Sequence, residues 1–143
     1  MQLDSDKPLF FDGAFGTYYF SLTGDEEPYE MANLKDPAVV LKIHRAYIEA
    51  GVQAIKTNTF GANPVLLPEP EELRRVLTAG WSIALKAAAG TRVQIFANIG
   101  GDDSDDAAEH YQTVAEEFLA IGAKNFLFET LPVFETLGPA LEL

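Results

Sequence analysis

Four short apolar runs, each ending in a polar side chain, divide this sequence into repeated units. The runs are centred near Phe10, Ile55, Ile95 and Leu127. Apolar runs of this length, bounded by polar residues and glycines, predict buried β-strands. The polar side chains that end them are Asp12, Asn58, Asn98 and Glu129. The most informative stretch, residues 50–63, joins a helix end, a buried strand and a polar loop, so we expect the chemistry to lie at such strand ends.

Segments with a helical spacing of apolar residues lie between these runs. The first predicted helix follows Asp36 and Pro37, an expected N-cap and first-turn proline, and ends at Gly51. Residues 69–89 and 107–122 predict the next two helices, and a further helical segment begins at Leu131. Residues 18–35 have no sustained period, which predicts a long surface loop.

This repetition of strand and helix predicts a parallel α/β architecture. Two forms fit it: a complete four-stranded open sheet, or the first four units of a (β/α)8 TIM-type barrel, that is, a half barrel. The four polar strand ends favour the half barrel, and no phosphate-binding glycine motif follows the first strand. In that barrel we expect four apolar side chains to point into the interior. They are Phe10, Ile55, Ile95 and Phe126.

Composition limits the classes of function. The chain has 143 residues, 48% of them hydrophobic, which predicts one globular domain over residues 1–143. Its net charge of −12 argues against nucleic acid or an anionic membrane as a partner, because both need clustered cations. The sequence shows no membrane-spanning run or secretory leader, so we expect a cytoplasmic location. It contains no cysteine, hence no thiolate metal ligand and no cysteine nucleophile.

The candidate binding residues lie at the strand ends. Asp12, followed by Gly13, would present a carboxylate beside backbone amides, although a solvated Asp-Gly turn fits the same pattern. Residues 57–59 place hydrogen-bonding side chains where the second strand ends, although a capped turn fits there too. His44 lies on the apolar stripe of its helix, which predicts a hydrogen-bonded core histidine. The acidic run at residues 102–106 predicts capping of a helix N-terminus in preference to a cation site.

Five sequence motifs occur in an order and at a spacing that point to a known family. They are residues 9–17 (LFFDGAFGT), residues 32–34 with Pro37, residues 43–51 (IHRAYIEAG), residues 57–63 (TNTFGAN) and Glu129-Thr130. Together they resemble the homocysteine S-methyltransferase family, over nearly the whole chain. The resemblance implies a (β/α)8 barrel that moves a methyl group from a donor to the sulfur of homocysteine. Betaine, S-methylmethionine and a methylfolate-derived cobalamin are such donors, and a cysteine-bound zinc activates the sulfur as a thiolate.

The resemblance also implies a substrate-binding role for six residues. They are Asp12, Gly13, Asn58, Thr59, Phe60 and Glu129. The two carboxylates are similar to the acidic residues that hold the amino group of homocysteine, which suits charge-assisted hydrogen bonds to an ammonium. Residues 58–60 are similar to those that line the substrate side of the second strand.

Two departures from the family are informative. The chain has no cysteine, so the zinc ligands implied by the resemblance are absent from it. Gly101 stands where many members have proline. We therefore expect the N-terminal half of a homocysteine-binding domain, which carries the amino-group end of the site, takes an unknown methyl donor and is inactive without the missing C-terminal half.

Two other kinds of function fit the same residues. The chain could be a non-catalytic module that binds an amino acid or a partner through the same mouth. It could also be an acid–base enzyme that uses Asp12 and Glu129 as a carboxylate pair. Whichever function holds, the unpaired first and fourth strands of a half barrel predict a homodimer or higher assembly through those edges.

Overall fold

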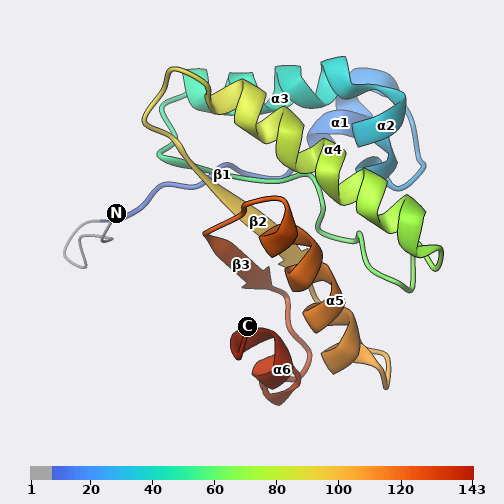
Figure 1. Cartoon of the computed structure of the whole chain (residues 1–143). Coiled ribbons are helices and arrows are strands. Elements are labelled where there is room, and N and C mark those ends of the chain that lie inside the picture. Colours follow the sequence, from blue (N-terminus) through green and yellow to red (C-terminus); the bar gives the residue numbers. More distant parts are fainter. Residues whose placement is uncertain (1–7) are drawn as a thin grey trace.

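The computed structural model describes residues 8–143, which fold into a parallel sheet with helices packed along it (Figure 1). In chain order the elements are α1 (Gly16–Thr23), η1 (Tyr29–Met31), α2 (Ala32–Lys35), α3 (Pro37–Glu49), β1 (Ala54–Lys56), α4 (Pro70–Ala88), β2 (Gln94–Gly100), α5 (Ala107–Ala120), β3 (Phe126–Glu129), η2 (Phe134–Leu137) and α6 (Gly138–Leu141). Among these residues, no helix combines the length and the apolar character needed to cross a membrane.

The three strands form one parallel sheet in the order β1-β2-β3. Ile55 pairs with Ile95 across the first ladder, and Asn98 pairs with Leu127 across the second. Helix α4 connects β1 to β2, and α5 connects β2 to β3. Parallel neighbours need such crossovers because the chain must return to the end of the sheet at which the previous strand began. The predicted α/β class with a parallel sheet is confirmed.

The first predicted strand, around Phe10, is wrong as a strand. Phe11 makes an isolated parallel bridge to Ala54. The Ala54 N–H donates to the Phe10 carbonyl at 3.1 Å, and the Asp12 N–H donates to the Ala54 carbonyl at 3.0 Å. β1 has three residues, and the chain turns towards α1 soon after Asp12, so the pairing ends before a ladder forms.

Residues 18–35 were predicted to be a long surface loop, but they hold helical structure. They contain most of α1 and all of η1 and α2. These helices are short and begin without a side-chain capping hydrogen bond, so they leave little signal in the sequence. Tertiary packing stabilises them instead, because Tyr19 and Ala32 are buried in one cluster with Val40 and Ile43 of α3.

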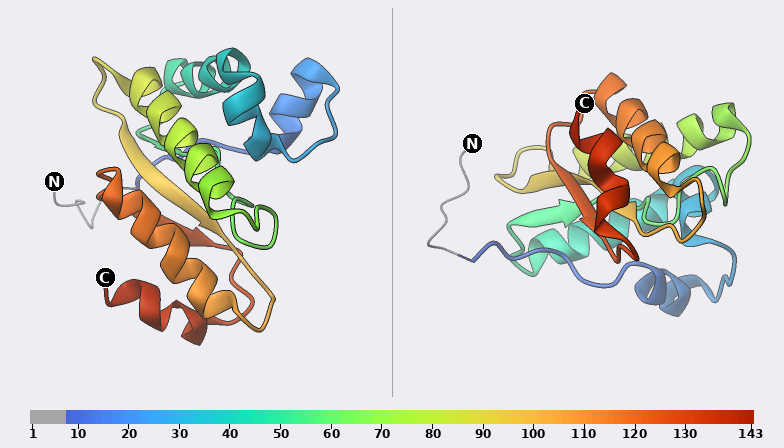
Figure 2. Two further views of the ribbon diagram at one scale, coloured as in Figure 1. Left: turned by 45° about the vertical axis from the view of Figure 1, so that its right-hand side comes forward. Right: turned by 90° about the horizontal axis from the view of Figure 1, so that it is seen from below.

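Helices α3, α4 and α5 cover one face of the sheet. Figure 2 shows α4 and α5 lying along the strands, and Figure 1 shows the helices following one another in chain order. Ile55 packs with Ala84 and Ala87 of α4. The second cluster joins sheet residues to α4 and α5, and its sheet members are Ile95, Ala97, Ile99, Phe126 and Phe128. Since side chains alternate along a strand, Lys56 and the two strand-end residues Asn98 and Glu129 face the other way.

The expected set of barrel-interior side chains is therefore wrong. Ile55, Ile95 and Phe126 pack in the clusters that face the helices, and Phe10 is 62% exposed. On the opposite face, the ring of Phe96 lies 4.9 Å from that of Phe11. Each of these strands carries apolar side chains on both faces, so the sequence pattern did not reveal which face the helices cover.

The ends of the three long predicted helices agree closely with α3, α4 and α5 but differ in mechanism at the N-terminus, whereas the segment predicted to be helical from Leu131 begins only at Phe134, as η2. α3 begins at Pro37, as expected, yet the side chain of Asp36 makes no capping hydrogen bond in the described structure. Three predicted helix-ending glycines adopt positive φ angles, which a glycine tolerates without strain. They are Gly51 (96°), Gly90 (77°) and Gly122 (91°).

His44 is a core residue, as predicted, but its expected hydrogen bonds are absent. The side chain is fully buried, and neither ring nitrogen has a hydrogen-bond partner within residues 8–143. Its ring lies 5.2 Å from that of Phe15. Burial lowers the pKa of His44 to about 4, so the imidazole is neutral at pH 7 and acts as a packing group.

Candidate functional site

A pocket of about 310 Å³ opens at the carboxyl ends of the strands, on the sheet face away from α3, α4 and α5. It is lined by residues 12–17, Tyr29, residues 56–60, Asn98 and Glu129. This lining includes all six residues that the sequence resemblance assigned to the substrate: Asp12, Gly13, Asn58, Thr59, Phe60 and Glu129. The fold thus brings together residues from the N-terminal segment, the loop after β1 and the end of β3.

Asp12 is held against the end of β1. Its Oδ2 accepts a hydrogen bond of 3.1 Å from the backbone N–H of Lys56. Its Oδ1 is buried and has no hydrogen-bond partner in the part of the chain that the structure describes. Burial raises the pKa of Asp12 to about 6, although the Lys56 N–H and the Lys56 charge act in the opposite direction. A buried carboxylate with one free oxygen favours a cation that can donate a hydrogen bond.

Thr57 and Thr59 tie the end of β1 to β2. The Thr57 Oγ1 accepts from the Asn98 N–H at 2.9 Å, and the Thr59 hydroxyl donates to the Asn98 carbonyl at 2.8 Å. The two hydroxyl oxygens are 2.7 Å apart, so Thr57 must be the donor between them. Because both hydroxyls are used within the protein, Thr59 shapes the pocket wall and has no free proton for a ligand.

Asn58 is fixed by amide hydrogen bonds to the segment before α3. Its Nδ2 donates to the Tyr29 carbonyl at 2.8 Å and to Asn33 Oδ1 at 3.0 Å, and Asn33 Nδ2 donates back to the Asn58 carbonyl at 2.8 Å. These bonds fix the orientation of the Asn58 amide. The Asn58 Oδ1 is therefore left buried and without a partner among residues 8–143.

Glu129 meets Lys56 across the pocket. The Lys56 Nζ lies 3.6 Å from the Glu129 Oε1, and the side chains are 21% and 31% exposed. Glu129 ends β3 directly opposite Gly100 of β2. The Gly100 N–H donates to the Phe60 carbonyl at 2.9 Å, which places the Phe60 loop beside Glu129.

Sequence reasoning left Lys56, Tyr29 and Asn98 out of the binding set, although all three line the pocket. The sequence pattern identifies Asn98 as a polar strand end but predicts no binding role for it. Lys56 had a usable signal, because a lysine within an otherwise apolar strand is unusual unless it has a partner. Tyr29 has no such signal, since it lies in the segment for which the sequence predicts a surface loop.

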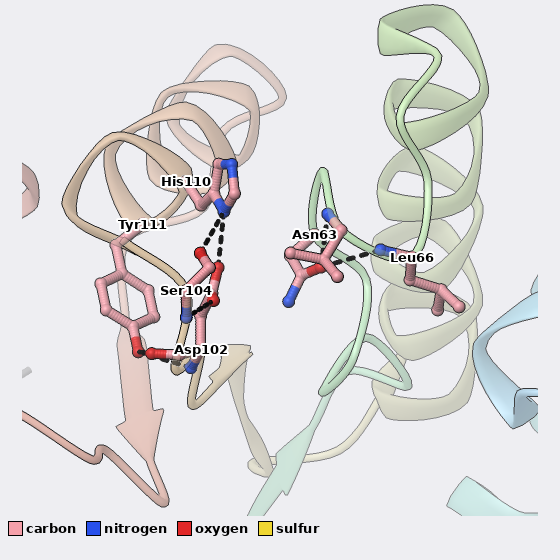
Figure 3. Close-up of polar contacts among 7 residues, drawn as sticks. Asn63, Leu66, Asp102, Ser104, His110 and Tyr111 are labelled. Atoms are coloured by element: carbon pink, nitrogen blue, oxygen red, sulfur yellow. Dashed lines mark hydrogen bonds and ion pairs between the residues drawn. The ribbon is translucent and has the colours of Figure 1, made fainter. Parts of the chain in front are cut away.

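The loop after β2 is fastened to α5 (Figure 3). Asp102 Oδ2 lies 2.6 Å from His110 Nδ1, and its Oδ1 accepts from the Ser104 N–H at 2.8 Å. Burial raises the pKa of Asp102, but the hydrogen bonds from Ser104 and His110 outweigh it and lower the pKa overall. Ser104 Oγ lies 3.4 Å from the same His110 nitrogen. A serine–histidine–aspartate relay needs the hydroxyl and the carboxylate on opposite ring nitrogens, so this cluster is a loop fastening.

The capping predicted for residues 102–106 is wrong. Asp106 is the N-cap residue of α5, and its side chain makes no capping hydrogen bond in the described structure. Within this run, Asp102 instead holds the loop after β2 against α5 through its contacts with Ser104 and His110. Figure 3 also shows Asn63 in the loop before α4. Its Oδ1 accepts a hydrogen bond of 3.1 Å from the Leu66 N–H, which stabilises that loop.

The pocket does not fit the zinc ion implied by the family resemblance. Protein zinc sites use thiolates, imidazoles and carboxylates in a close tetrahedral set. Residues 8–143 contain no group of three or more such side chains arranged to hold a metal ion.

Comparison with known proteins identifies the family. The model of the homocysteine S-methyltransferase family matches residues 9–143. The chain is 34% identical over 94 residues to the methionine synthase of Mycobacterium tuberculosis (strain ATCC 25618 / H37Rv), a match that covers 59% of this chain and 8% of that protein. This parallel α/β chain belongs to the homocysteine S-methyltransferase family.

Solved structures agree at the level of the fold. The metallated form of the homocysteine methyltransferase MmuM from Escherichia coli superposes with a TM-score of 0.81 at 20% identity. The match covers 96% of this chain and 59% of MmuM. The apo form of MmuM gives a TM-score of 0.74 at 22% identity and covers 97% and 56%. The chain thus spans less than two thirds of each of these relatives.

Proposed function

We propose that this chain supplies the amino-group end of a homocysteine site in a homocysteine S-methyltransferase. The observation that carries the proposal is the pocket that both Asp12 and Glu129 line. The free Oδ1 of Asp12 and the partly exposed carboxylate of Glu129 suit a ligand ammonium, which each can bind through a charge-assisted hydrogen bond. The surrounding wall is formed by Gly13, Asn58, Thr59 and Phe60.

The proposal places thiol activation outside these 143 residues. In it, the three strands belong to a half barrel of the (β/α)8 type, and cysteines of another segment or chain hold the zinc. The absence of cysteine from the sequence and the poor fit of the pocket to zinc support this division. The chain then binds the amino-acid end of homocysteine but does not transfer a methyl group by itself. The methyl donor is likewise bound outside it.

Titration of the purified chain with L-homocysteine tests the proposal. In the presence of EDTA and a phosphine reductant, calorimetry or NMR should show one binding site. L-Methionine should bind with a similar affinity, because the chain does not hold the sulfur. 4-Mercaptobutyric acid lacks the amino group and should bind at least about tenfold more weakly, since charge-assisted hydrogen bonds are lost.

Three results would contradict this proposal. Homocysteine binding that appears only after zinc is added would show that binding depends on the thiol of homocysteine and not on its amino group. Equal affinity for 4-mercaptobutyric acid would remove the role of the carboxylates. Methyl transfer to homocysteine by the chain alone, from S-methylmethionine or betaine, would show that thiol activation does not need another segment.

We also propose that two copies of the chain associate through the open edges of the sheet. Within residues 8–143, β3 pairs with β2 alone, and the bridge at Phe11 is the one pairing on the other edge. Phe10 is 62% exposed, and Val133 and Phe134, which follow β3, are 50% and 68% exposed. Unpaired strand edges with exposed apolar side chains favour association.

Light scattering measures this association directly. At micromolar concentration we expect a mass of at least twice the 15.6 kDa of one chain. A monomer mass together with an absence of hydrophobic-dye binding would contradict the homodimer and point to a self-sufficient sheet.

A further inference from the structure

Lys56 places a cation beside the Glu129 carboxylate in the candidate pocket. Its Nζ lies 3.6 Å from the Glu129 Oε1, while its own backbone N–H is bound by Asp12. Asp12, Lys56 and Glu129 are the charged side chains that line the pocket, so its lining carries two negative charges and one positive charge. Neither the sequence pattern nor the family resemblance assigned a role to this lysine.

The ion pair between Lys56 and Glu129 can be replaced by contacts with a ligand with little loss of stability. Its side chains are 21% and 31% exposed, and pairs with this much solvent contribute little net stability. A ligand ammonium that binds Glu129 would come close to the Lys56 Nζ and be repelled by it. The repulsion disappears when the same ligand brings a carboxylate, because Lys56 then exchanges the Glu129 carboxylate for that of the ligand.

We propose that Lys56 makes the pocket select α-amino acids over amines that lack a carboxylate. The inference rests on the proposed function, because it takes the ammonium of the ligand to lie between Asp12 and Glu129. An α-amino acid carries both an ammonium and a carboxylate, so its two charges can pair with the carboxylates and the Lys56 ammonium that line the pocket. A plain amine leaves Lys56 unpaired beside a like charge, which is a repulsive element of specificity.

The test compares L-homocysteine with 3-aminopropane-1-thiol, which is homocysteine without its carboxylate. Their dissociation constants are measured under reducing conditions for the wild-type chain, K56Q, K56M and K56R. Removing the charge should weaken homocysteine binding about five- to tenfold and strengthen binding of the amine. The preference for the amino acid should fall at least about tenfold in K56Q and K56M and persist in K56R. Two uncharged variants are used so that the test survives if one of them folds poorly.

K42Q is the matched control. Lys42 lies on the exposed surface of α3 outside this pocket, so K42Q makes the same change in net charge without touching the site. It should leave the preference unchanged. If K56Q and K56M prefer homocysteine over the amine as strongly as K42Q does, the role of Lys56 is overturned. The proposed function still stands in that case, provided that the wild type binds homocysteine. If the wild type binds neither ligand, the proposed function fails and the inference fails with it.

Discussion

Asp12→Asn is expected to stabilise the chain at pH 7 and to weaken its binding of homocysteine about 10- to 100-fold. The asparagine Oδ1 can still accept the Lys56 N–H, so the contact that holds this segment to β1 is kept. What disappears is a buried negative charge. Because burial raises the pKa of Asp12 from 3.8 to about 6, ionising it in the folded chain costs about 3 kcal/mol. The loss of affinity follows from the removal of a charge-assisted hydrogen bond to the ammonium.

The stability gain should depend on pH in a defined direction. A carboxyl group whose folded pKa is raised stabilises the fold when protonated, and this contribution is lost as the pH rises through the folded pKa. The difference in the free energy of unfolding between Asp12→Asn and the wild type should therefore be largest above pH 6. This difference should vanish near pH 4. Urea denaturation at several pH values measures it. His44, whose pKa is about 4, titrates in both proteins and cancels in the difference.

Asp12→Ala is the matched control for this prediction. It also removes the charge, but it leaves the Lys56 N–H without its acceptor. It should therefore gain less stability than Asp12→Asn, or lose stability, while losing as much affinity. If Asp12→Asn destabilised the chain at pH 7, or bound homocysteine as tightly as the wild type, the role given to the buried carboxylate would be wrong.

Gly101→Ala is expected to destabilise the chain by about 3 kcal/mol or more. A Cβ atom at this position would overlap the backbone carbonyl of Thr130, and it would lie 3.2 Å from Pro132 Cδ. A backbone atom cannot rotate away as a flexible side chain can, so the loop after β3 would have to shift. Thr130 already adopts a φ angle of 60°, which is uncommon for a residue with a side chain.

The same shift should weaken ligand binding, because Glu129 directly precedes Thr130 and its carboxylate lines the pocket. Thermal or urea unfolding and the homocysteine titration measure the two effects together. Gly138→Ala is the control: a Cβ there meets no atom of the described chain within 4 Å, so the unfolding free energy should change by less than about 0.5 kcal/mol. If Gly101→Ala is as stable as the wild type, the loop after β2 and the loop after β3 do not pack as described.

The Gly101 position also explains a departure from the family. The resemblance places proline here in many members, and proline carries a Cβ as alanine does. In this chain the loop after β3 comes so close to residue 101 that a glycine is required. The sequence revealed the difference, but only the contact with Thr130 supplies its reason.

The sequence by itself determined the α/β class, the parallel order and the longer helices. These features depend on local pattern: the apolar spacing along α4 and the glycines after α3 and α5 act within a few residues of themselves. The polar strand ends were also local, so Asp12 and Glu129 were found before any contact between their elements was known. The family motifs strengthened this reading because they occur at those same strand ends.

Only the tertiary structure decided which side chains meet. The short helices between Gly16 and Lys35 form because Tyr19 and Ala32 are buried against α3, and no periodicity within them predicts this. The strands are apolar on both faces, so only the packed helices separate Ile55, in the core, from Lys56, in the pocket. The pairing of Lys56 with Glu129 joins residues 73 positions apart in sequence across the sheet. Such a contact is set by the order and register of the strands, which no local pattern encodes.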